Sequence, residues 1–151
     1  MTSRKETAAQ GGKTATRPAI VSSAHLVSEH SAEMSEFEFG LIVAGNAFHR
    51  WVVHCVSAAG LKDLTPLDVI VLHHVTHRAR DKRLADICFI MNVEDTHLIN
   101  YALKKLLNLG VVASSKNGKE VTYAATDTGR AYVQRYREIR EAFARMIAAM
   151  P

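Results

Sequence analysis

The sequence contains little cysteine and no long apolar run, and each shortage excludes a class of protein. Two cysteines among 151 residues are too few for the disulfide framework of a small secreted protein. No stretch approaches the roughly 18 consecutive apolar residues that a membrane-spanning helix requires. The basic residues near the start are followed by no apolar segment of the kind that signal peptides contain. We therefore expect a cytoplasmic protein that does not associate with a membrane.

Charge of one sign is in only small excess. The chain has 19 Lys and Arg residues against 15 Asp and Glu residues, a net charge of +4. Such an excess permits an anionic partner without requiring one. The length is typical of one domain with its own core. Residues 1–30 are rich in Ser, Thr, Ala and Gly with few large apolar side chains, so we predict that they form a flexible tail.

A long first helix is predicted from Ser35, where the pattern Ser-x-x-Glu is typical of a capping box, to Gly60. Its apolar residues recur at helical spacing. They are Phe37, Leu41, Ala44, Phe48, Val52, Cys55 and Ala59. A second apolar edge, which includes Ile42 and Trp51, makes this stripe wider than one small domain usually covers.

Two further helices are predicted to form a helix-turn-helix. Before these two, another helix is predicted to begin at Thr65-Pro66 and to run to about His77, and residues 78–83 are predicted to form a loop. A short helix then covers residues 84–90, a tight turn falls at Asn92, and the next helix runs from about Asp95 to Gly110. Two helices joined by so few residues are typical of this motif.

After Gly110 the pattern changes to two β-prone runs, residues 111–116 and 119–125, separated by the hairpin signal Asn117-Gly118. Thr126 then caps a final helix whose apolar positions alternate by four and three residues, which is typical of a helix that packs on another helix. These positions are Tyr132, Tyr136, Ile139, Phe143, Met146 and Met150. The predicted fold is mainly α with a small two-stranded β-wing, a winged helix-turn-helix between long N- and C-terminal helices.

The helix within "NVEDTHLINYALKKLLNLG" (92–110) has polar residues opposite its apolar side. In winged-helix proteins this helix enters the major groove of DNA. Asn100 suits a bidentate contact with adenine, whereas Lys104 and Lys105 suit phosphates. The polar stripe comprises His97, Asn100, Tyr101, Lys104 and Asn108. An ordinary solvated helix face is the alternative interpretation.

Four motifs resemble those of the MarR-type winged-helix transcription regulators, over roughly residues 36–147. They are "LTPLDVIVLHHV" (64–75), "RLADI" (83–87), "ALKKLLNLGVV" (102–112) and "ATDTGRAY" (125–132). The resemblance implies a homodimer joined through its terminal helices, which binds double-stranded DNA and releases it when a small-molecule effector or oxidant binds. It places DNA contacts on Thr96, His97, Asn100 and Tyr101.

The resemblance also implies how the domain, residues 31–151, is divided. Residues 31–60 would form the N-terminal dimerisation helix, 61–126 the DNA-binding region and 127–151 the C-terminal dimerisation helix. The wing "SSKNGKE" departs from the family pattern, because it lacks an Asp-x-Arg tip and offers only Lys116 and Lys119 to DNA. The turn before the recognition helix is one residue longer than usual. Both features indicate a divergent subgroup with a short wing.

Eight histidines raise the question of a metal site. His73 and His77 lie four residues apart on one helix, but zinc sites usually need a third ligand, and no adjacent Glu suggests a metallohydrolase. Structural histidines are therefore favoured, and no metal or cofactor is expected. Cys55 and Cys88 lie among apolar residues, where thiols are inert. An effector would bind between the dimerisation helices and the DNA-binding region, near His49, Val53 and His74.

The sequence is compatible with three candidate functions. The first is a homodimeric, sequence-specific DNA-binding transcription regulator, and the second is a winged-helix protein-interaction module that does not bind DNA. The third, a small metal-dependent enzyme, rests only on the histidine count. Nothing in the sequence resembles paired catalytic carboxylates, a Ser-His-Asp set or a phosphate-binding loop, so we expect no enzymatic activity.

Overall fold

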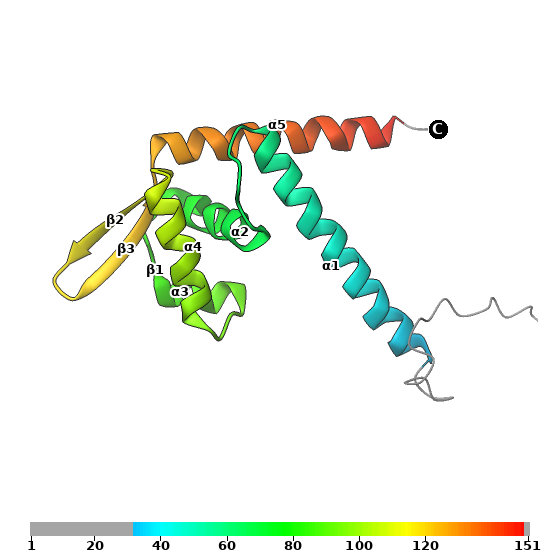
Figure 1. Ribbon diagram of the computed structural model, residues 1–151, viewed down its shortest axis with the longest axis horizontal. Coiled ribbons are helices and arrows are strands. Elements are labelled where there is room, and N and C mark those ends of the chain that lie inside the picture. Colours follow the sequence, from blue (N-terminus) through cyan, green and yellow to red (C-terminus); the bar gives the residue numbers. More distant parts are fainter. Residues whose placement is uncertain (1–31, 150–151) are drawn as a thin grey trace, which may run out of the picture. The chain divides into compact units, whose positions relative to one another are not determined.

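The computed structural model describes residues 32–149, with five α-helices and a small antiparallel sheet among them (Figure 1). The chain divides into two units after Ala44, within helix α1 (Ala32–Ala58). The predicted tail and the apolar position Met150 lie outside the described residues. Helix α1 already includes Ala32, so the prediction that Ser35 begins it is wrong by about one turn. None of the described helices combines the length and the apolar composition needed to cross a bilayer.

Helix α2 (Pro66–Thr76) begins where the sequence predicts, because Thr65 and Asp68 cap it reciprocally. The Asp68 amide donates to Thr65 Oγ1 at 3.2 Å, and the Thr65 amide donates to the Asp68 carboxylate at 2.8 Å. These two bonds satisfy amides that have no partner within the helix. A short 3-10 turn, η2 (His77–Ala79), follows.

Helices α3 (Leu84–Met91) and α4 (Thr96–Asn108) form the predicted helix-turn-helix. Asn92 ends α3 in the left-handed conformation, with φ of +51°, which Asn tolerates better than most residues. Asp95 caps α4 by accepting a hydrogen bond from the His97 amide at 2.9 Å. Both turn signals were visible in the sequence.

The sheet has three antiparallel strands in the order β1-β3-β2, one more than the predicted wing. Strand β1 (Lys82–Arg83), expected as loop, pairs with β3 (Glu120–Ala125). Strand β2 (Val112–Asn117) pairs with β3 from Val112–Ala125 to Asn117–Glu120. The turn is therefore Gly118-Lys119, one residue later than predicted, with φ of +61° at Gly118.

Helix α5 (Asp127–Ala148) begins at a tightly bonded junction with the wing. Thr126 Oγ1 accepts from the Gly129 amide at 3.0 Å and donates to the Gly110 carbonyl at 2.8 Å. A Cβ on Gly129 would lie 2.0 Å from the Val111 carbonyl oxygen. Only glycine therefore fits at this point of the "ATDTGRAY" motif.

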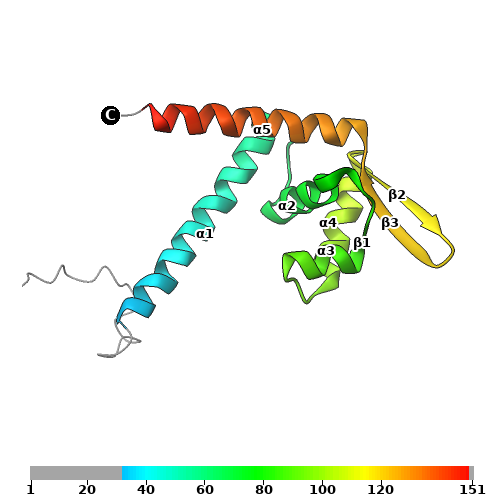
Figure 2. The same cartoon turned by 180° about the vertical axis from the view of Figure 1, so that it is seen from behind.

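One hydrophobic core lies beneath the helix-turn-helix, formed by α2, α3, α4, α5, the sheet and the C-terminal half of α1. Side chains fully withdrawn from solvent include Leu72, Ile87, Ile99, Leu103 and Leu106. Figures 1 and 2 show the β2–β3 hairpin projecting beyond α4 in both views. The core therefore supports α4 from one side and leaves its other side and the wing available.

Candidate nucleic-acid interface

Helix α4 has one buried face and one exposed face, and the exposed face is the first part of the candidate interface. Ile99, Ala102, Leu103 and Leu106 are buried in the core, as the sequence predicts. The exposed face of α4 comprises Thr96, His97, Leu98, Tyr101, Lys104 and Asn108. Because residues three and four positions apart are neighbours on a helix, these side chains form one continuous surface.

Two apolar groups dominate the exposed face of α4. The side chain of Leu98 is 50% exposed and that of Tyr101 is 75% exposed. The Lys104 ammonium lies 5.9 Å from the centre of the Tyr101 ring, a cation–π distance. Asn100, which the sequence analysis assigned to this face, is only partly exposed. Leu98 was not assigned to it, although it lies three residues before Tyr101.

Lys105 has a different environment from its neighbour Lys104. Its ammonium lies 3.0 Å from the Asp68 carboxylate of α2, and it also donates to the Asp63 carbonyl oxygen. Asp68 is buried and has the cap of α2 as its other partner. Lys105 therefore joins α4 to α2, a role that the sequence analysis did not predict.

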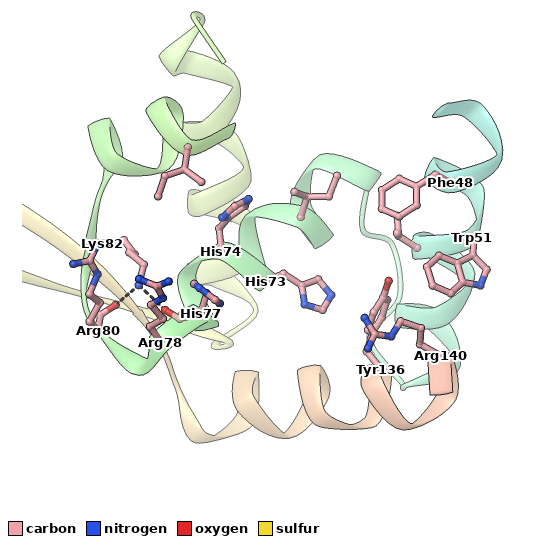
Figure 3. Close-up of a pocket in the computed structure, with 13 residues that line it drawn as sticks. Phe48, Trp51, His73, His74, His77, Arg78, Arg80, Lys82, Tyr136 and Arg140 are labelled. Atoms are coloured by element: carbon pink, nitrogen blue, oxygen red, sulfur yellow. Dashed lines mark hydrogen bonds between the residues drawn. The ribbon is translucent and has the colours of Figure 1, made fainter. Parts of the chain in front are cut away.

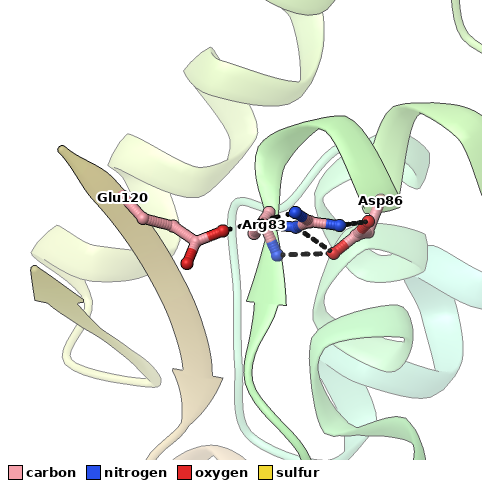
Figure 4. Close-up of polar contacts among 3 residues, drawn as sticks. All are labelled: Arg83, Asp86 and Glu120. Carbon is pink, nitrogen blue, oxygen red and sulfur yellow. Dashed lines mark hydrogen bonds and ion pairs between the residues drawn. The ribbon is translucent and has the colours of Figure 1, made fainter. Parts of the chain in front are cut away.

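The wing presents two exposed lysines, Lys116 at the end of β2 and Lys119 in the turn. The hairpin that positions them is tied to the first helix of the helix-turn-helix (Figure 4). The Arg83 guanidinium lies 2.9 Å from the Asp86 carboxylate of α3 and 3.3 Å from the Glu120 carboxylate of β3. The hydrogen bonds from Arg83 lower the pKa of Asp86 to about 2.

A cavity of about 570 Å³ is lined by residues of α1, α2, α3, α5, β1 and the segment that leads to β1 (Figure 3). At one end are the aromatic rings of Phe48, Trp51 and Tyr136. Of the residues that line it, none is acidic and seven are basic. The basic ones are His73, His74, His77, Arg78, Arg80, Lys82 and Arg140.

Burial and neighbouring cations favour the neutral form of two of these histidines. Desolvation lowers the pKa of His73, and Arg140 and His74 lower it further. Desolvation also lowers the pKa of His74, with added contributions from His77 and Lys82. The His73 ring lies 4.5 Å from that of Tyr136, nearly edge-on. The cavity thus has positive charge without a counter-charge in its lining.

A family model described as a winged helix DNA-binding domain matches residues 64–129, which contain the helix-turn-helix and the wing. The chain therefore has a winged-helix fold. A MarR-family regulator of known structure shares this fold at 19% identity, so the resemblance that the motifs indicate is confirmed at the level of the fold. A search of the curated proteins finds no match.

Solved structures share this MarR-type fold at low sequence identity. RV1404 from Mycobacterium tuberculosis has a TM-score of 0.64 at 17% identity, over 82% of this chain and 84% of that one. A transcriptional regulator of the MarR family from Rhodococcus sp. RHA1 has a TM-score of 0.62 at 19% identity, over 82% and 86%. CouR from Rhodococcus jostii RHA1, bound to p-coumaroyl-CoA, has a TM-score of 0.60 at 19% identity, over 78% and 82%.

Of the three residues predicted to bind an effector, only one lines the cavity. His74 lines the cavity, whereas His49 and Val53 are not among its lining residues. The residues beside them along α1, Phe48, Trp51 and Val52, line it instead. Helical periodicity places a residue on a face but does not fix which edge of that face meets a cavity, so spacing alone could not place His49 and Val53 relative to this one.

A second hollow is an apolar groove between the C-terminal half of α1 and α5, with a volume of about 650 Å³. Its largest apolar side chains are Phe48, Trp51, Phe143 and Ile147. Phe143, Met146 and Ile147 are each about half exposed. Phe143 and Met146 belong to the heptad-like spacing predicted for the last helix, and Ile147 lies next to Met146 in the chain.

The cysteines and histidines considered as redox or metal sites lie in the following surroundings. Cys55 and Cys88 are buried free thiols, and burial raises the pKa of Cys55. Within residues 32–149, no group of three or more His, Cys, Asp or Glu side chains has the arrangement to hold a metal ion. His73 and His77 thus lack a third metal ligand among the described residues.

Proposed function

We propose that this chain is a cytoplasmic, homodimeric transcription regulator that binds specific sequences of double-stranded DNA. The observation that supports this most strongly is the exposed face of α4, which the core leaves open to solvent next to a hairpin that carries two exposed lysines. In a winged-helix protein this face lies in the major groove. Thr96, His97, Asn100 and Tyr101 would contact base edges, and Lys104, Lys116 and Lys119 would contact phosphates.

The apolar groove between α1 and α5 supports the homodimer. Groups as apolar as Phe143 and Ile147 are half exposed in the single chain, and a second copy would bury them. The first unit, residues 32–44, taken by itself, is a helix that exposes further large apolar side chains. Two copies would then present two α4 helices to successive major grooves, about 34 Å apart.

Regulation by a small molecule is supported by the cavity. A space lined by aromatic rings at one end and by basic groups at the other, with Arg140 beside the rings, suits an aromatic anion. The structure of CouR, which is similar in fold, contains p-coumaroyl-CoA, a ligand with an aromatic group and negative charge. We therefore propose an anionic aromatic effector whose binding alters the position of α2 and α5, and we propose no catalytic role.

The experiment is a binding titration of the full chain with DNA fragments from around its own gene, at two salt concentrations. We expect a specific complex whose affinity falls with salt by about 0.9 logarithmic units per phosphate contact for each tenfold rise in salt. Asn100→Ala should relax sequence preference, whereas Lys104→Ala should weaken binding to all sequences about equally. Unchanged affinity in both variants would remove α4 as the recognition helix.

A protein-interaction module without DNA binding is the second candidate. One observation favours it, the exposure of two adjacent apolar residues on α3, Phe89 (87%) and Ile90 (52%), because aromatic side chains are enriched at protein interfaces. The same titration separates the two candidates. A module of this kind would bind no DNA fragment in preference to another.

A further inference from the structure

Two exposed side chains of α4 are of a kind that hydrogen-bonded recognition of bases does not need. Leu98 has no hydrogen-bonding group, and Tyr101 presents an aromatic ring, yet both lie on the one helix face that the core leaves free. They are three residues apart, so their side chains are neighbours. Leu98 lies in the first turn of α4, the part of a recognition helix that approaches bases most closely.

Among the base edges of the major groove, only thymine presents an apolar group, its C5 methyl. The other edges present donors and acceptors, and covering these with a leucine would leave them without partners. We propose that Leu98 and the ring of Tyr101 recognise thymine methyl groups in the major groove. The inference rests on the proposed DNA-binding function and names the base that this surface selects.

The positive charge next to Leu98 and Tyr101 favours DNA, rather than an apolar protein surface, as the partner that covers them. The Lys104 ammonium lies 5.9 Å from the centre of the Tyr101 ring. The apolar pair is thus next to a cation, an arrangement that suits a methyl group close to the phosphate backbone. A purely apolar partner would leave this ammonium group poorly solvated.

The test begins with selection of DNA by the full chain from a library of duplexes with about 20 random base pairs, long enough for two half-sites. The enriched duplex is then resynthesised with deoxyuridine in place of each thymidine in turn. This change removes one methyl group and keeps base pairing. We expect about a fourfold loss of affinity at each contacted thymine, the value of burying one methyl-sized group.

Variants connect this loss to the two side chains. In Leu98→Ala or Tyr101→Ala the deoxyuridine effect should disappear at one thymine per half-site, whereas Tyr101→Phe should keep it because the ring remains. Leu109→Ala is the matched control, since Leu109 is 44% exposed at the other end of α4. It should bind and discriminate like the original chain.

The outcomes separate the two proposals. If a sequence is enriched but deoxyuridine has no effect at any position, DNA binding stands and the methyl recognition is wrong. The inference is also wrong if Leu98→Ala and Tyr101→Ala retain the full deoxyuridine effect. If no sequence is enriched from the library, both the proposed function and the inference fail.

Discussion

The Lys105 ammonium lies 3.0 Å from the Asp68 carboxylate and thereby joins the last turn of α4 to the first turn of α2. Asp68 is buried, and its carboxylate also accepts from the Thr65 amide. One carboxylate thus caps α2 and fixes α4 on it. This contact adds to the burial of the apolar face of α4 in holding the helix on α2, so this cation serves the fold.

Adjacent lysines should therefore respond differently to the same substitution. Lys105→Ala should lower the free energy of unfolding by about 1–2 kcal/mol, because it leaves the buried Asp68 without its charged partner. Lys104→Ala should change it by less than about 0.5 kcal/mol but weaken DNA binding and flatten its salt dependence. Urea unfolding and DNA titration of both variants make the comparison. Equal loss of DNA affinity without loss of stability would show that Lys105 contacts DNA.

The junction between wing and α5 should tolerate no side chain at Gly129. A Cβ there would overlap the Val111 carbonyl oxygen, so Gly129→Ala requires the backbone to shift and should cost about 3 kcal/mol in the free energy of unfolding. Gly45→Ala is the matched control, because a Cβ at that position of α1 would meet nothing within 4 Å. Replacing a helical glycine there should stabilise the protein by up to about 1 kcal/mol. A neutral Gly129→Ala would mean that the junction is loosely packed.

Much of the fold could be predicted because its boundaries are set by local chemistry. The capping hydrogen bonds of Thr65, Asn92 and Thr126 reach residues within four positions in the chain, and the structure places each residue at the predicted boundary. Strand β1 could not be predicted in this way. Its two residues have no strand pattern of their own and pair with β3 about 40 positions later in the chain.

The candidate site was predictable in part for the same reason. Helical spacing identifies the buried face of α4, so the exposed side of the helix follows. Helical spacing does not show how much of each polar side chain is buried by neighbouring helices and strands. The partial burial of Asn100 and the pairing of Lys105 with Asp68 depend on packing across the fold. Leu98 was missed because a leucine is expected to be buried.

Acid should loosen the tie between the wing and α3. The hydrogen bonds from Arg83 lower the pKa of Asp86 from 3.8 to about 2, so the folded state binds this proton less readily than the unfolded chain. A lowered carboxyl pKa stabilises the fold above about pH 4, and this contribution is lost as pH falls towards 2. Asp86→Asn should reduce the loss of stability over that interval, measured by unfolding at several pH values. Glu94→Gln, an exposed acid in the turn before α4, should leave the profile unchanged.

The proposed dimer should depend on the groove between α1 and α5. Phe143→Glu places a charge among Phe48, Trp51 and Ile147, and burying it between two copies would be strongly unfavourable. Light scattering after gel filtration should show a monomer, with weaker binding to a two-fold symmetric site. The control is Phe89→Glu, which puts the same charge on α3, at a phenylalanine that is 87% exposed. If Phe143→Glu remains dimeric, the subunits associate through another surface.

Binding of an aromatic anion in the cavity should take up protons. Burial and the cations Arg140 and Lys82 lower the pKa values of His73 and His74, so the folded state favours their neutral forms. The stability that this gives is present above the ordinary histidine pKa of 6.5 and is lost as pH falls below it. An anion offsets the surrounding positive charge and raises both pKa values. Affinity should therefore increase as pH falls from about 7.5 to about 5.5, by up to about tenfold per pH unit for each proton taken up.

A suitable probe is 2-naphthoate, whose binding can be followed by calorimetry in buffers with different ionisation enthalpies. The heat should vary with the buffer, because binding draws protons from it. His73→Gln should reduce this variation, since one of the two titrating groups is gone. His54→Gln should retain it, because His54 is exposed and is not among the residues that line the cavity. Heat that is the same in all buffers would mean that the histidines keep their protonation state, and that Arg140 and the basic segment before β1 alone balance the anion.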